Sequence, residues 1–365
     1  MINDMKFNLV ISEEDKPFLE HDGNYFKING NAYSLLNMLK DGKNIEEISV
    51  IMNVGIPEIN VALINIDSAI GNVKSSSKIK KILVCLNERG CNFIGRLLFR
   101  IFNKTVFYTA LIVSSISCII FYWLFADMSF IYANVGIIEY IIILLLIMFV
   151  HEIGHVSAAY KFGIRDLKID FGVFFIWPVF FVKLNKQVLL SRNNRIIVSA
   201  GGLYFQLLLS LVCMGLYLIS GWDILLLFNN LNLAMVTLNG FPFLILDGYW
   251  IYADLCKIEN LNAKAKALSK TLLSGLSQFR QAPLALSSYT LLMLCTIVLL
   301  TGWMAYYLVS RAKYIPGMFY LLQENISLGI IFRGLLLFLP YLLLLIYLIK
   351  VAYGKLFRNN GSNRK

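Results

Sequence analysis

Long apolar stretches alternate with shorter polar segments along most of the chain. Six such stretches lie near residues 105–125, 136–160, 196–220, 224–250, 285–309 and 327–353. A helix needs about 20 apolar residues to cross the hydrocarbon layer of a bilayer, and most of the six are long enough. The pattern predicts a polytopic α-helical membrane protein with about six spans. The fourth stretch is the least regular, because Asn239, Gly240 and Pro242 interrupt it.

The first 75 residues have a different pattern, in which short apolar runs are separated by charged residues and turns. Residues 25–28 are expected to form a strand or part of a hairpin, followed by a turn at Asn29-Gly30. Three helices are predicted next, over 32–40, from residue 45 onward, and over 56–73. Residues 1–75 are therefore expected to be a small α+β domain of winged-helix size.

Residues 76–104, between this domain and the first apolar stretch, are basic and amphipathic. The cationic side chains are Lys78, Lys80, Lys81, Arg89, Arg96, Arg100 and Lys104. Amphipathic basic segments bind the interface of anionic membranes, so this segment is expected to lie on the inner leaflet.

Composition and charge agree with a membrane protein. Hydrophobic residues make up 58% of the 365 residues and charged residues only 15%, against roughly 25% charged residues in soluble domains. The net charge is +11, but the Lys and Arg residues cluster beside apolar stretches and form no basic stripe interleaved with aromatics. This favours the positive-inside pattern over nucleic-acid binding. We expect a multi-pass plasma-membrane protein with a transmembrane domain over 105–353, a basic tail over 354–365 and both termini in the cytoplasm.

The second apolar stretch contains the sequence His-Glu-Ile-Gly-His. His151 and His155 are four residues apart, so they share one face of a helix and can chelate one metal ion. Glu152 could act as a general base on a metal-bound water, whose pKa zinc lowers to about 7. Gly154 would let a neighbouring element approach closely. Ionisable residues inside a span are expensive to bury and are usually functional.

Two histidines do not complete a catalytic zinc site, which needs a third protein ligand and an open position. Asp247 is the best candidate, because it lies near the end of the fourth stretch, at a depth similar to that of the histidines. Glu139 lies about three turns away on the histidine helix and cannot reach. Taken alone, Asp247 could instead be an ordinary carboxylate at a helix terminus before Gly248.

His-Glu-x-x-His in one span, with Asn-x-x-Pro-x-x-x-Leu-Asp-Gly in a later one, resembles the site-2 protease family of intramembrane zinc metalloproteases. The second motif reads Asn239, Pro242, Leu246, Asp247 and Gly248. The resemblance covers roughly residues 136–255. The chain departs from the family where a Gly-Pro pair is usual, since Gly201-Gly202-Leu203 stands there.

The resemblance implies one Zn²⁺ per chain, held by His151, His155 and Asp247, with Glu152 as general base and acid. It also implies that Asn239 binds substrate or the oxyanion, although a helix-breaking cap before Pro242 is an alternative. Other polar residues within the spans are expected to make interhelical hydrogen bonds. They are Gln206, Asn229, Asn230 and Asn232.

Residues 167–171 alternate with period two, and Trp177-Pro178 is expected to mark a turn, which predicts a hairpin at the membrane surface. In the family such a segment can hold an extended substrate by strand addition. Phe171 and Trp177 are therefore candidate substrate-strand residues. A surface hairpin without any role in substrate binding remains an alternative.

The sequence of residues 25–52, YFKINGNAYSLLNMLKDGKNIEEISVIM, resembles small PqqD-like peptide-recognition domains, and the likeness covers about residues 6–70. It implies that residues 1–75 bind the leader of a ribosomally made precursor peptide by adding a strand. A generic winged-helix domain with a packing or regulatory role is the alternative.

The hypothesis from sequence is a zinc metalloendopeptidase in or at the membrane, which processes a ribosomally synthesised precursor peptide. Its partners would be a peptide or membrane-protein substrate and the lipid bilayer. Two alternatives remain open. One is intramembrane cleavage of a membrane-anchored regulator such as an anti-sigma factor. The other is a non-catalytic membrane subunit of a peptide export or immunity system.

Overall fold

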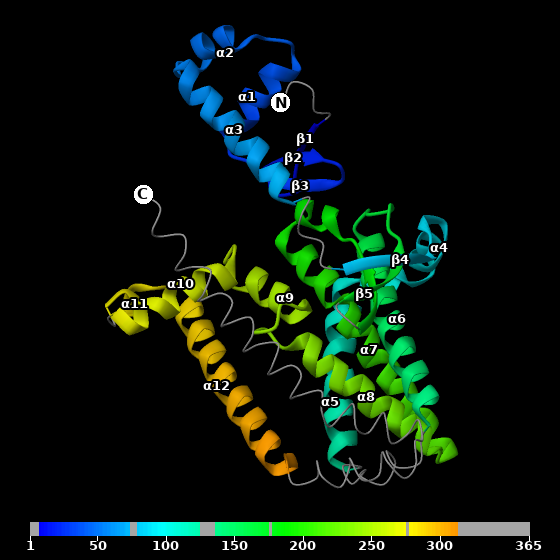
Figure 1. Ribbon diagram of the computed structural model, residues 1–365. Coiled ribbons are helices and arrows are strands. Elements are labelled where there is room, and N and C mark those ends of the chain that lie inside the picture. Colours follow the sequence, from blue (N-terminus) through cyan, green and yellow to red (C-terminus); the bar gives the residue numbers. More distant parts are fainter. Residues whose placement is uncertain (1–6, 74–78, 125–135, 175–176, 275–276, 313–365) are drawn as a thin grey trace, which may run out of the picture. The chain divides into compact units, whose positions relative to one another are not determined.

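The computed structural model describes residues 7–73, 79–124, 136–174, 177–274 and 277–312 (Figure 1). The chain divides into two compact units. The first contains Met1–Ala133 and Ile142–Glu259, and the second contains Asn134–Ile141 and Asn260–Lys365.

The N-terminal region (residues 7–73) begins with a three-stranded antiparallel sheet of order β1-β2-β3. Its elements are β1 (Asn8–Ile11), β2 (Pro17–His21), β3 (Asn24–Lys27), α1 (Gly30–Lys40), α2 (Ile45–Met52) and α3 (Ile56–Val73). Local signals define the helix starts. The Asn29 side chain caps α1, and Asn44 with Glu47 forms a capping box on α2. The strand and the three helices expected from the sequence are confirmed.

The core of this region joins the sheet to the helices. Leu19 of β2, Leu36 of α1 and Ile70 of α3 are buried together, and a second buried group lies between α1, α2 and α3. Burial of such side chains provides the main favourable free energy for a domain of this size.

A second antiparallel sheet has the order β4-β5-β6. Its strands are β4 (Ile79–Leu86), β5 (Ile169–Phe174) and β6 (Trp177–Val182). The predicted hairpin of β5 and β6 is confirmed. Trp177 and Pro178, expected in the turn, instead begin β6, where Pro178 pairs with Val173. Proline is tolerated there because β6 is an edge strand of the sheet.

Strand β4 comes from the basic segment in which no strand was predicted. Gly172 of β5 permits its approach, because a Cβ atom at Gly172 would lie 2.6 Å from the Lys80 carbonyl oxygen. The segment continues as α4 (Glu88–Leu98) and a short 3-10 turn, η2 (Phe99–Phe102). Helix α4 buries Cys91 and Gly95 and exposes Phe93, Arg96 and Leu97, as expected of an amphipathic helix.

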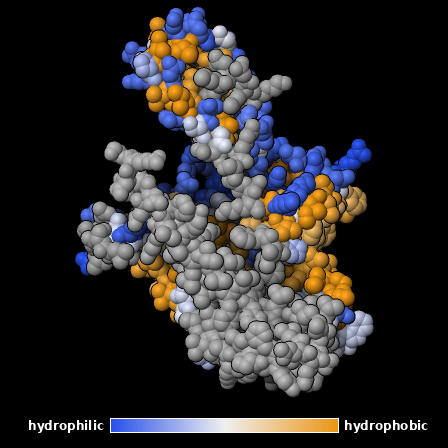
Figure 2. All heavy atoms as spheres, viewed as in Figure 1, coloured by the Kyte–Doolittle hydropathy of each residue, from blue (hydrophilic) through white to orange (hydrophobic). Residues whose placement is uncertain are grey.

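Three helices of the described chain are long and apolar enough to cross a membrane, and the chain is therefore treated as a membrane protein. They are α5 (Lys104–Leu124), α6 (Ile137–Lys161) and α7 (Arg192–Ser220). Large apolar side chains are exposed along α5 and the second half of α7. Broad apolar areas are also visible outside the N-terminal region in Figure 2. Such surfaces suit contact with lipid.

Helix α7 is the central element of the first unit. After the short turn η4 (Asn185–Leu189), it packs against α5, α8 (Asp223–Gly240) and α9 (Asp247–Leu255). Helices α6 and α7 meet at two glycines, since a Cβ atom at Gly154 would lie 2.2 Å from the Gly201 carbonyl oxygen. The expectation that Gly154 allows close approach of a neighbouring element is confirmed.

The predicted interruption of the fourth apolar stretch is also confirmed. Helix α8 ends at Gly240, residues 241–246 are not helical, and α9 begins at Asp247. The chain folds back tightly here, because a Cβ atom at Gly248 would lie 2.2 Å from the Gly240 carbonyl oxygen.

The second unit contains α10 (Leu261–Ser274), α11 (Ser277–Gln281) and α12 (Leu284–Ala312), with α10 packed on α12. Helix α12 corresponds to the fifth predicted stretch. The sixth stretch (327–353) and the basic tail (354–365) lie outside the described residues. Of the six expected spans, three are shown as candidates.

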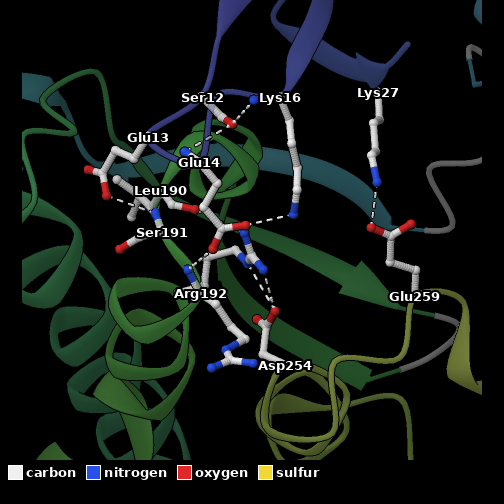
Figure 3. A network of polar contacts seen from close by, with 11 residues as sticks. Ser12, Glu13, Glu14, Lys16, Lys27, Leu190, Ser191, Arg192, Asp254 and Glu259 are labelled. Atoms are coloured by element: carbon white, nitrogen blue, oxygen red, sulfur yellow. Dashed lines mark hydrogen bonds and ion pairs between the residues drawn. The ribbon is translucent and has the colours of Figure 1, made fainter. Parts of the chain in front are cut away.

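The turn between β1 and β2 caps the N-terminus of α7 (Figure 3). The Glu13 carboxylate accepts hydrogen bonds from the Ser191 amide at 2.8 Å and the Asn194 side chain at 3.0 Å. The Glu14 carboxylate accepts from the Arg192 amide at 2.6 Å. Carboxylates stabilise a helix N-terminus because the first amides lack intrahelical partners. The N-terminal region is thereby attached to α7.

Candidate metal centre

Helix α6 places two imidazoles beside each other. The Nε2 atoms of His151 and His155 are 3.1 Å apart, and the two residues are only 8% and 4% exposed. Their i, i+4 spacing on a regular helix produces this arrangement, as expected from the sequence.

The opposite ring nitrogens each face a carbonyl oxygen of α7. His151 Nδ1 lies 2.9 Å from Gln206 Oε1, and His155 Nδ1 lies 2.8 Å from the Val198 carbonyl oxygen. Each Nδ1 therefore carries the hydrogen, and each Nε2 keeps a free lone pair. Metal-binding histidines are commonly held in this way.

Asp247 completes a group of three, here called the triad (His151, His155 and Asp247). Its Oδ2 atom lies 2.9 Å from His151 Nε2 and 3.4 Å from His155 Nε2. The break after α8 brings the carboxylate to this place, because Asp247 is the first residue of α9.

The triad fits a zinc ion. In a tetrahedral zinc site with bonds of about 2.0–2.1 Å, ligand atoms lie about 3.3 Å apart, close to the three separations found. Three atoms with lone pairs converge, and a cation among them would relieve their repulsion. Two imidazoles and one carboxylate also leave the fourth position open, as catalytic zinc requires.

Glu152 follows His151 on α6 and interacts electrostatically with all three members of the triad. Its carboxylate also interacts with the backbone of Val182, the last residue of β6. The end of the β5–β6 hairpin therefore lies beside Glu152.

Phe171 is connected to the histidine helix through one other ring. It contacts Phe180 of β6 with ring centroids 5.1 Å apart, and Phe180 contacts Phe149 of α6 at 5.3 Å. Trp177 begins β6, at the opposite end of the strand from Val182. Phe171 is thus linked to the histidine helix through Phe180.

Asn239 is half-buried in the last turn of α8, next to the Gly240–Gly248 contact. Among the described residues, no hydrogen bond joins Asn239 to the triad. Its role toward substrate or oxyanion stays a prediction.

The partners in two contacts near the triad were not predicted from the sequence. The expected interhelical hydrogen bond of Gln206 is confirmed, and its partner is His151 of α6. Arg195 of α7 donates from Nε and Nη2 to Asp254 Oδ1 at 3.0 and 2.7 Å, which attaches α9 to α7. Neither pairing has a local sequence signal, because each joins residues more than fifty positions apart.

Comparison with known proteins gives one partial similarity. The chain is 42% identical over 60 residues to "Putative peptide zinc metalloprotease protein YydH" of Bacillus subtilis (strain 168). This part of the chain is thus similar to part of a protein named as a putative peptide zinc metalloprotease. The match spans 16% of this chain and 24% of that relative. No family model and no solved structure matches.

Proposed function

We propose that this chain is a zinc metalloendopeptidase of the site-2 protease type, which acts in or at the plasma membrane. The observation that carries the proposal is the convergence of two imidazole Nε2 atoms and one carboxylate oxygen within 2.9–3.4 Å of one another. The partial similarity to a protein named as a peptide zinc metalloprotease supports the same chemistry. Zinc bound by the triad would act as a Lewis acid and make hydroxide available near neutral pH.

Glu152 would serve as the proton carrier of the reaction. It would take a proton from the attacking water and deliver it to the leaving amine. The interaction with the Val182 backbone would help to orient the carboxylate. The side-chain amide of Asn239 would donate to the developing oxyanion.

The substrate would lie along the open edge of β6. Pro178 has no N–H to donate to β5, so alternation along the strand would turn the backbone groups of Phe180 and Val182 toward this edge as well. An added strand would thus pair mainly with 180–182, directly beside Glu152. Phe171 and Trp177 stay candidate substrate-strand residues.

A precursor peptide is the substrate class that the architecture favours. A region that resembles leader-binding domains is attached by Glu13 and Glu14 to α7, and α7 supplies the hydrogen-bond partners of both histidines. Residues 1–75 would bind the leader in the cytoplasm while the core peptide reaches β6.

The proposal predicts distinct losses for two substitutions in the full-length protein. Glu152→Gln is expected to abolish cleavage and to retain zinc, because it removes only the proton carrier. Asp247→Asn is expected to abolish cleavage and also to lower the zinc content, because it removes a proposed metal ligand. Glu139→Gln is the matched control, since Glu139 is an exposed glutamate of the same helix.

Cleavage would be scored in cells on two co-expressed substrates, a short precursor peptide and a membrane-anchored regulator, and zinc by elemental analysis of purified protein. Undiminished cleavage by Glu152→Gln would refute the enzyme assignment. Cleavage of the regulator alone would refute the substrate class.

A further inference from the structure

Gln206 is the side chain in direct contact with the back of the His151 ring. It lies in the middle of α7, is fully buried, and accepts from His151 Nδ1 through Oε1 at 2.9 Å. Its amide nitrogen Nε2 has no hydrogen-bond partner among the described residues. A buried amide donor without a partner requires an explanation, and an ordered water is the usual one.

Asn232 of α8 offers the complementary group. Its Nδ2 donates to the Gln206 carbonyl oxygen at 2.6 Å and to Ser210 Oγ at 2.8 Å. Its Oδ1 is a buried acceptor with no partner within the described ranges. Gln206 of α7 and Asn232 of α8, which are joined by a hydrogen bond, thus present one unused donor and one unused acceptor.

The orientation of the Gln206 amide matters for the metal centre. With the oxygen toward His151, Nδ1 carries the hydrogen and the Nε2 lone pair points to Asp247 Oδ2, 2.9 Å away. With the Gln206 amide reversed, its NH₂ group would face the Nδ1–H group of His151, and two donors would meet without an acceptor. The ring would then turn away or move its hydrogen to Nε2, the atom that must bind the metal.

We propose that Gln206 is the positioning residue of His151, and that a buried water shared with Asn232 keeps the Gln206 oxygen directed at the ring. The inference rests on the proposed zinc site. A positioning role differs from a packing role in what it affects. If Gln206 only packed the helices together, its loss would lower stability without changing metal affinity.

The test compares zinc binding by full-length variants in detergent, measured by competition with a chromophoric chelator. Gln206→Met keeps the volume but removes the acceptor, and is expected to weaken zinc binding by about 10–100-fold. Gln206→Glu keeps an acceptor for Nδ1 and is expected to bind zinc nearly as the wild type. Ser114→Ala is the control, a buried polar residue of α5 whose hydroxyl bonds only within its own helix.

The visible spectrum of the Co²⁺-loaded protein supplies a readout of ligand geometry, which is expected to change in Gln206→Met and not in Ser114→Ala. Thermal unfolding of the metal-free proteins reports packing separately. If Gln206→Met does not fold, Asn232→Leu carries the test, because it leaves Gln206 in place. It is expected to lower zinc affinity by removing the water's acceptor.

Wild-type affinity and an unchanged Co²⁺ spectrum in Gln206→Met, or in Asn232→Leu where the former does not fold, would overturn the positioning role. A wild-type protein that binds no zinc would instead overturn the proposed function. The two failures are therefore distinguishable.

Discussion

The space available to the His151 ring is set by one missing methyl group. A Cβ atom at Gly202 would lie 2.4–2.6 Å from three atoms of the imidazole, well inside van der Waals contact. The ring fits against α7 only because residue 202 has no side chain. Gly202 belongs to the Gly201-Gly202-Leu203 segment, and its lack of a side chain provides this space.

We predict that Gly202→Ala lowers zinc affinity at least tenfold, because the added methyl displaces His151 from its position beside Asp247. Chelator competition on the purified protein measures the effect. Gly215→Ala is the matched control, since it lies on the same helix with nothing within 4 Å of its would-be Cβ atom. Equal affinities in the two variants would contradict the prediction.

At the residue scale, the sequence was informative where the chemistry is local or the motif is specific. The His151–His155 spacing follows from helix geometry alone, and Asp247 was selected by its depth and motif. The interhelical bond of Gln206 was predicted but its partner was not, and the Arg195–Asp254 pair was missed, because these partners depend on how α6, α7 and α9 pack. Phe171 and Trp177 looked equivalent, since only the strand register shows which end of β6 meets Glu152.

At the element scale, α9 is held in place by the Arg195–Asp254 ion pair. Both side chains are about one-fifth exposed, at 20% and 19%, so the pair is better shielded from water than most surface pairs. Asp254 lies in the last turn of α9, the short helix that Asp247 begins. The pair therefore fixes the element that delivers the third member of the triad.

We predict that Arg195→Met destabilises the protein by about 1–3 kcal/mol, because it leaves a partly buried carboxylate without its donor, and that it also lowers zinc affinity. Denaturant unfolding and metal titration measure the two effects. Lys27→Met is the control, as Lys27 and Glu259 form an exposed pair, and such pairs contribute little. The prediction fails if both variants behave alike.

The elements themselves could be predicted to different degrees. The helices of the N-terminal region follow from caps and turn residues that act within a few positions. The break in the fourth stretch follows from Gly240 and Pro242. Strand β4 was not predicted, because its basic sequence suits an interfacial helix equally well and only pairing with β5 decides between them.

For the molecule as a whole, the attachment between the N-terminal region and α7 depends on charge. Lys16 donates to the Glu14 carboxylate, and the Arg192 amide donates to it as well, so the pKa of Glu14 is lowered. The ionised form is the one that caps the helix. Its stabilising contribution is complete above the ordinary glutamate pKa of about 4.3, and is lost as the pH falls through the lower pKa of the attached state.

We predict faster amide hydrogen exchange at Ser191 and Arg192 in the double variant Glu13→Gln, Glu14→Gln at neutral pH, and in the wild type at acidic pH once intrinsic rates are corrected. Glu58→Gln, an exposed glutamate of α3, is the control and should exchange as the wild type. Unchanged protection in the double variant would show that the carboxylates do not hold the two parts together.

The hydrogen bonds of Glu13 and Glu14 to the N-terminus of α7 constrain the membrane topology of the chain. Glu13 and Glu14 touch the first residues of α7, so both must lie on one side of the membrane. Between them stand α5 and α6, each long enough to cross once. The chain returns to the same side of the membrane only after an even number of crossings. Helices α5 and α6 must therefore both cross the membrane, or neither does. An insertion error that skipped either one would leave α7 uncapped, and the triad would lose the helix that orients its histidines.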